Sequence, residues 1–123
     1  MLAAKSVGHS KEGLSGVQFL AILERLGIAA EMKAKLKTYE GAGLPQAIAT
    51  GEVELGVTGL GTVIAVPSVE FVGALPKEIQ AYVFFTAGVA SSTKELAASK
   101  ALLQFMTGPD GAPVFKANGM ERD

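Results

Sequence analysis

Residues 10–18 read SKEGLSGVQ, and this stretch combines a helix start with two glycines. Ser15 is predicted to be the N-cap residue, because Gln18 follows three positions later and would complete a capping box. The first N–H groups of such a helix lack intrahelical partners, and the helix dipole adds positive potential at the same place. We therefore predict a site for an oxyanion or a carboxylate here. The alternative is a well-capped helix that binds nothing.

Composition excludes several classes of function. The chain has 123 residues, of which 49% are apolar and 19% charged, which predicts one folded domain with a hydrophobic core. The formal net charge is −1, and no basic face for nucleic acid is visible. The sequence has no cysteine and one histidine, His9, which excludes disulfides and cysteine metal sites and rules out a His-rich metal cluster. We predict that His9 is solvated and that the protein uses no cofactor.

The order of segments predicts an α/β fold with a mostly parallel sheet flanked by helices. The predicted strands are residues 5–8, 34–39, 54–58, 69–75 and 81–89. The predicted helices are residues 16–26, 44–49, 63–66, 92–106 and 109–118. Ser92 and Glu95 are expected to form a second capping box at the fourth of these helices. Residues 1–5 resemble the last turn of a helix that leads into a strand, so the chain is expected to be a fragment.

Three glycine-containing turns, residues 10–16, 41–43 and 58–62, each follow a predicted strand and precede a predicted helix. In open parallel sheets such turns gather at the carboxyl ends of the strands, where ligands bind. Helix N-termini that meet there would hold an anion through backbone N–H groups alone. The alternative is that the glycines only permit tight turns.

Catalysis has little support in the sequence. The glutamates are scattered, and no pair has a spacing that indicates acid/base work. No nucleophile stands next to a base, and no phosphate-binding glycine motif is present. We therefore predict no catalytic residue and do not expect an enzyme.

Seven segments, taken in order, resemble the extracellular solute-binding proteins of ABC transporters. The nearest group is the molybdate-binding-like branch, which has the type II periplasmic binding protein fold. The segments are residues 2–6 (LAAKS), 26–29 (LGIA), 51–57 (GEVELGV), 72–76 (VGALP), 100–105 (KALLQF), 108–109 (GP) and 116–120 (KANGM). The likeness extends over essentially the whole chain.

Proteins of this family have two lobes joined by a hinge, and the chain resembles their second half. Residues 1–80 would form the second ligand-binding lobe. Residues 81–123 would form the returning hinge strand and the C-terminal helices, which pack on the first lobe in the family. The first lobe and a signal peptide would lie upstream, which implies a periplasmic or extracellular location.

The resemblance places the ligand at the three turns. The implied ligand-binding residues are Ser10, Ser15, Gly16, Gly41, Ala42, Gly43, Thr58 and Gly59. Molybdate binders carry a tyrosine at the position that Gly59 occupies. A small organic acid is therefore as compatible with this pattern as a molybdate-like oxyanion.

The implied function is the capture of a small anion for the permease of an ABC importer. The alternative is a small-molecule-sensing effector domain of a transcription regulator, which has the same fold class. A lobe of an enzyme is the third interpretation. Apolar residues of the C-terminal helices would be left uncovered without a first lobe, so we also expect a homodimer.

Overall fold

The computed structural model describes residues 1–40 and 42–121. The chain divides into two units, Met1–Val83 and Phe84–Asp123. The predicted assignment of residues 1–80 and 81–123 to a lobe and to hinge-and-helix segments stays a prediction. Each unit is described by itself below.

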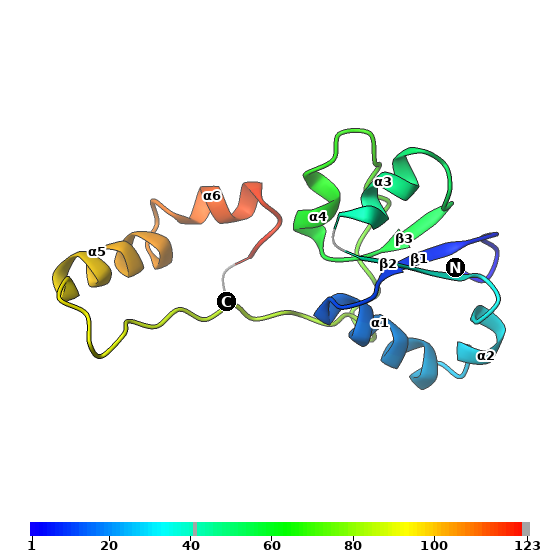
Figure 1. Ribbon diagram of the computed structural model, residues 1–123, viewed down its shortest axis with the longest axis horizontal. Coiled ribbons are helices and arrows are strands. Elements are labelled where there is room, and N and C mark those ends of the chain that lie inside the picture. Colours follow the sequence, from blue (N-terminus) through cyan, green and yellow to red (C-terminus); the bar gives the residue numbers. More distant parts are fainter. Residues whose placement is uncertain (41, 122–123) are drawn as a thin grey trace. The chain divides into compact units, whose positions relative to one another are not determined.

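The first unit is built on a parallel sheet with the strand order β2-β1-β3 (Figure 1). The strands are β1 (Val7–Ser10), β2 (Leu36–Tyr39) and β3 (Leu55–Val57). The central strand β1 runs parallel to both neighbours, and its Val7 pairs with the first residue of each. The carboxyl ends of all three strands therefore lie at the same edge. This arrangement confirms the predicted α/β fold with a parallel sheet.

Helices cover both faces of this sheet (Figure 1). On one face lie α1 (Leu14–Arg25), which follows β1, and the short helix α2 (Ala29–Met32), which was not predicted. On the other face lie α3 (Gly43–Ala49), which follows β2, and α4 (Leu60–Ile64), which follows β3. Each strand leads through a loop into a helix, and the connections from β1 to β2 and from β2 to β3 are the helical crossovers that parallel neighbours require.

The core lies between the sheet and α1 with α2. Val7, Phe19, Leu23 and Met32 form a fully buried cluster there. His9 lies two residues after Val7 in β1, so its side chain points to the same face. It is only 5% exposed, and its ring centroid is 6.0 Å from that of Phe19. The prediction of a solvated His9 was wrong, because the polar residues around it end a buried strand.

Two polar neighbours satisfy the His9 ring inside this core. Its Nδ1 lies 3.0 Å from the carbonyl oxygen of Ser10, and its Nε2 lies 3.3 Å from Oγ1 of Thr38. A buried polar ring costs free energy unless such partners are present. His9 therefore links the end of β1 to the neighbouring strand β2.

A pair of glycines lets α3 approach the other face of the sheet. Gly8 and Gly56 are paired across β1 and β3. A Cβ atom at Gly8 would overlap the side chain of Leu44, and one at Gly56 would overlap that of Ile48. Leu44 is 2% exposed, so its side chain occupies the volume that larger strand residues would need. The glycines in both strands are explained by this close packing.

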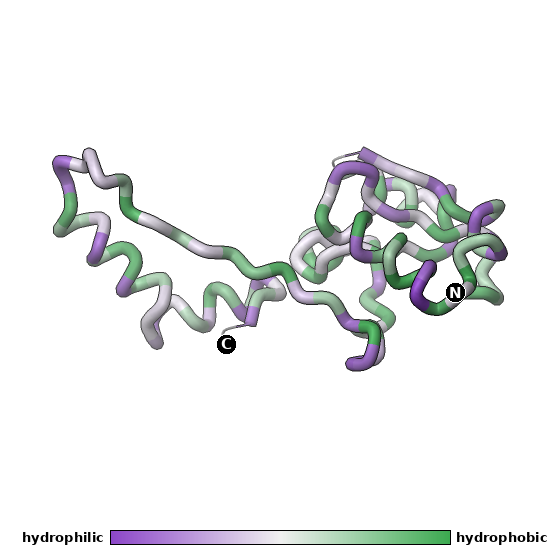
Figure 2. Tube along the Cα trace, turned by 90° about the horizontal axis from the view of Figure 1, so that it is seen from below, coloured by the Kyte–Doolittle hydropathy of each residue, from purple (hydrophilic) through white to green (hydrophobic). Residues whose placement is uncertain are grey.

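The second unit contains α5 (Leu96–Thr107) and α6 (Ala112–Ala117). Neither helix contains a buried residue. Polar and apolar residues are interspersed along both helices and the segment before them (Figure 2). The large apolar side chains that are exposed in this unit are Phe84, Phe85, Leu96, Leu102, Phe105, Val114 and Met120.

Two predicted strands and one predicted helical turn are wrong. Residues 67–95 contain no strand, although strands were predicted at residues 69–75 and 81–89. Their β-branched and aromatic residues favour an extended backbone, but a strand also needs a neighbour that accepts its hydrogen bonds. Residues 2–3 form a turn and no helix, with the Ala4 N–H donating to the Met1 carbonyl at 3.0 Å.

Both predicted capping boxes are wrong as well. The helix α1 begins at Leu14 with Gly13 as its N-cap residue, so Ser15 lies inside the first turn. The helix α5 begins at Leu96 with Glu95 as its N-cap residue, and no side chain caps it. Helices α4 and α6 also differ at their starts from the predicted residues 63 and 109.

A close crossing explains where α1 begins. Gly16 is buried against the backbone of Ser10 at the end of β1. A Cβ atom at Gly16 would overlap the Ser10 carbonyl oxygen and lie 2.9 Å from its carbonyl carbon. The helix must therefore place this glycine on the strand, and this contact outweighs the local preference of Ser15 for a cap.

Gly16→Ala is expected to lower the free energy of unfolding by about 3 kcal/mol, because the methyl group overlaps backbone atoms that cannot rotate away. Urea unfolding followed by circular dichroism measures this change. Gly59→Ala is the matched control, since Gly59 has φ −65° and nothing lies within 4 Å of an added Cβ atom. Equal midpoints for the two variants would contradict the close crossing.

Candidate functional site

The loops that follow the three strands all begin at the carboxyl edge of the sheet, within the first unit. Ser10 pairs with Tyr39, and His9 pairs with Val57, so the three strands end side by side. Thr58 directly follows β3 at this edge. The loops after β1, β2 and β3 lead into α1, α3 and α4, and Figure 1 shows these connections.

The start of α1 has two N–H groups with a hydrogen-bond partner and two without one among the described residues. Those of Gly16 and Val17 both donate to the Gly13 carbonyl, at 2.9 and 3.2 Å. The N–H groups of Leu14 and Ser15 make no hydrogen bond to any residue that the structure describes. Leu14 and Ser15 can therefore donate to a guest, whereas the Gly16 N–H is already used.

Ser10 shapes this loop from the end of β1. Its hydroxyl oxygen accepts a hydrogen bond from the Gly13 N–H at 3.1 Å. This bond holds the turn closed and places the start of α1 directly beyond the strand. Ser10 is half-buried, so its hydroxyl group acts first as a structural partner of the loop.

The β2–α3 loop contributes less than the sequence predicted. Gly41 lies outside the described residues. Ala42 is the exposed N-cap residue of α3, and Gly43 is its first residue. The Gly43 N–H donates to the Glu40 carbonyl at 2.9 Å, so it is not available to a guest.

The β3–α4 loop borders open space at Gly59. Thr58 is half-buried, and Gly59 is the exposed N-cap residue of α4. The N–H groups of Thr62 and Val63 donate to the Gly59 carbonyl at 3.0 and 3.4 Å. The space beside Gly59 is empty of other atoms to 4 Å, so this rim position could hold a larger side chain or a guest.

An ion pair that the sequence analysis missed joins two of the loops. The Lys11 ammonium group donates to Oε1 of Glu40 at 2.7 Å, and the Lys11 N–H donates to the Tyr39 carbonyl at 2.8 Å. Lys11 and Glu40 each follow one residue of the pair Ser10 and Tyr39. The sequence does place opposite charges directly after two strands. The pairing could be predicted only with the strand register, which brings the two residues side by side.

Tyr39 contributes to packing and not to the open edge. Its hydroxyl group donates to Oε1 of Glu52 at 2.7 Å. Burial is the main cause that raises the pKa of Tyr39 to about 12, and the hydrogen bond and charge of Glu52 add to it. Tyr39 therefore stays protonated at neutral pH and keeps its hydrogen bond to Glu52.

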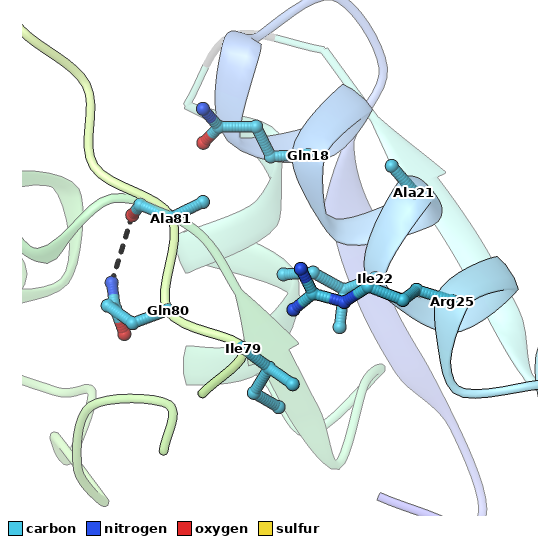
Figure 3. Close-up of a pocket in the computed structure, with 7 residues that line it drawn as sticks. All are labelled: Gln18, Ala21, Ile22, Arg25, Ile79, Gln80 and Ala81. Carbon is cyan, nitrogen blue, oxygen red and sulfur yellow. Dashed lines mark hydrogen bonds between the residues drawn. The ribbon is translucent and has the colours of Figure 1, made fainter. Parts of the chain in front are cut away.

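Two cavities of the first unit are lined by residues other than those of the three loops. One has a volume of about 240 Å³, between α1 and the segment that leads out of the unit (Figure 3). Its lining residues are Gln18, Ala21, Ile22, Arg25, Ile79, Gln80 and Ala81. The other, of about 460 Å³, is lined by residues of α1, α2 and β2 with their neighbours. Neither is lined by a predicted site residue.

Other kinds of site find no support in the described residues. No group of three or more His, Cys, Asp or Glu side chains there could hold a metal ion. No helix in residues 1–40 and 42–121 has the length and apolarity that crossing a membrane requires.

Comparisons with known proteins agree with the fold. The periplasmic molybdate-binding protein of Azotobacter vinelandii matches with a TM-score of 0.71 and 21% identity, over 98% of this chain and 55% of its own. An aconitate isomerase from Pseudomonas sp is 29% identical over 119 residues, which are 96% of this chain and 45% of that protein. The chain therefore spans about half the length of each, and it has the fold of a type II periplasmic binding protein lobe.

The family follows from a match over nearly the whole sequence. The profile of the bacterial extracellular solute-binding proteins matches residues 5–121. This match favours a substrate-binding role over the sensing domain of a transcription regulator. The chain belongs to the bacterial extracellular solute-binding protein family.

Proposed function

We propose that the chain forms one ligand-binding lobe of the solute-binding component of an ABC importer and captures a small anion at the carboxyl edge of its sheet. The observation that carries this proposal is the meeting of three loop–helix junctions at one edge. At α1, the helix dipole adds to two N–H groups, those of Leu14 and Ser15, that have no partner among the described residues. The proposed ligand contacts also include Ser10, Thr58 and the loop residues of α3 and α4.

The anion is a molybdate-like oxyanion or a small organic acid. The name of the similar molybdate-binding protein supports the oxyanion, and the name of the similar aconitate isomerase supports the organic acid. Both ligand types carry negatively charged oxygens, which backbone N–H groups bind through short charge-assisted hydrogen bonds. Gly16 acts by its packing, and Gly59 leaves room for the guest.

In this proposal, a second lobe closes over the bound anion, and a permease accepts the closed form. Closure follows ligand binding only when the ligand has higher affinity for the closed state. The location that suits this role is periplasmic. The chain by itself supplies one side of the site, so we expect a dissociation constant in the millimolar range, or about 4 kcal/mol of binding free energy.

Catalysis is the second candidate, because the aconitate isomerase is an enzyme by its name. A proton transfer would need a positioned acid or base at the open edge. The carboxylates in the loops of this edge are those of Glu12 and Glu40, and Glu40 is paired with Lys11. We therefore propose binding without turnover.

Ser15→Asp is expected to weaken anion binding at least tenfold while it stabilises the fold by about 0.3–1 kcal/mol. The first turn of α1 has no acidic residue, so a carboxylate there gains from the helix dipole and occupies the place of the anion. Isothermal titration with molybdate, tungstate and sulfate measures the affinity, and urea unfolding measures the stability.

Ala97→Asp is the matched control for this variant. It adds the same charge to the first turn of α5, which also lacks an acidic residue, and Ala97 is exposed. The control should leave anion binding unchanged. Unchanged affinity in Ser15→Asp, or equal losses in both variants, would contradict a site at the start of α1.

The second unit suggests that copies of this chain associate. Its helices have no buried residue, and exposed apolar side chains such as Phe84, Leu102 and Phe105 leave a large surface without cover. Such surfaces drive association. We propose a homodimer of the chain when it is alone in solution.

Light scattering coupled to gel filtration tests the homodimer. We expect the mass of two chains at high concentration, and a shift toward one chain in Phe105→Glu, because the carboxylate would have to be buried without a partner. Glu40→Gln, in the other unit, serves as the control. One chain's mass at high concentration would count against association.

A further inference from the structure

We propose that Glu40 is an internal competitor of the ligand, which holds the ammonium group of Lys11 until an anion takes it over. This inference rests on the proposed function, because it concerns the affinity and the charge selectivity of the same edge. It makes Lys11 a ligand-binding residue of the anion and Glu40 the residue that sets the strength of binding.

The backbone fixes both residues beside the open edge. The Lys11 N–H donates to the Tyr39 carbonyl at 2.8 Å, and the Glu40 carbonyl accepts from the Gly43 N–H at 2.9 Å. Lys11 begins the loop that leads to the donors Leu14 and Ser15 of α1. Glu40 begins the loop that leads to α3. The pair therefore stands between two of the three junctions.

The side chains of the pair are poised to exchange partners. The Lys11 ammonium group and Oε1 of Glu40 are 2.7 Å apart, but the side chains are 58% and 66% exposed. An exposed pair of this kind contributes little to folding stability. The ammonium group sits on a flexible stem, so it can leave the carboxylate for another oxygen anion.

The charges in these loops explain why release of Lys11 from Glu40 would change the affinity for an anion. Lys11 is the cation of the loops after β1 and β2, where Glu12 and Glu40 are the carboxylates. While Glu40 holds Lys11, the Lys11 charge is neutralised. An approaching anion is then attracted by the backbone dipoles and repelled by the Glu12 carboxylate. Removing the Glu40 charge releases the ammonium group, and the Coulomb gain grows with the charge of the guest.

Glu40→Gln is therefore expected to tighten anion binding about threefold to tenfold at low ionic strength, and Lys11→Gln to weaken it by a similar factor. The gain in Glu40→Gln should be larger for sulfate than for acetate. Amide chemical shifts of this chain, titrated with sodium acetate and sodium sulfate, give the dissociation constants of each variant.

Glu52→Gln is the matched control. Glu52 is also an exposed glutamate near a lysine, with 4.0 Å between its Oε1 and Nζ of Lys37, but it precedes β3 instead of following a strand. The control changes the net charge by the same amount. It should leave the dissociation constants within the error of wild type.

The double variant Lys11→Gln with Glu40→Gln separates competition from simple repulsion. If Glu40 acts by holding Lys11, Glu40→Gln should raise the affinity less than half as much in the Lys11→Gln background as in the wild-type background. Equal gains in both backgrounds, or equal gains in Glu40→Gln and Glu52→Gln, would overturn the inference while anion binding stands. No sulfate-induced shift in either wild type or Glu40→Gln would overturn the proposed function together with it.

Discussion

The parallel pairing of β1 with both of its neighbours is the constraint on which the rest depends. Because each pair is parallel, β1 reaches β2, and β2 reaches β3, through helices that cross a face of the sheet. The loops that follow the three strands therefore begin at one edge. Had β3 paired antiparallel to β1, the loop at Gly59 would lie at the opposite edge, and no joint site could form.

Glycines make this small sheet possible, and they do so in different ways. Gly8 and Gly56 have no side chains, so α3 can pack close to the sheet, and Gly16 lets α1 cross close to the end of β1. The close packing at these three positions explains the glycines without a ligand. Gly59, in contrast, lies in open space at the rim. The same residue type thus supports close packing at three positions and borders open space at a fourth.

The sequence predicted the alternation of strands and helices, the parallel sheet and the edge at which the turns gather. It misplaced the start of α1, since the contact between Gly16 and Ser10 is made in three dimensions and outweighs the cap preference of Ser15. It predicted strands after residue 67 from side-chain preference alone, where no neighbouring strand exists in the described residues. It missed the pair of Lys11 and Glu40 because their proximity depends on the strand register.

We propose that the strand ends form one shared anion site, and this proposal can be checked by mapping amide chemical shifts during titration with molybdate. The amides of Leu14, Ser15, Ala42 and Gly59 should shift together and follow one dissociation constant. Shifts that centre on the Gln18–Arg25 face of α1, or that give a separate constant for each loop, would contradict it.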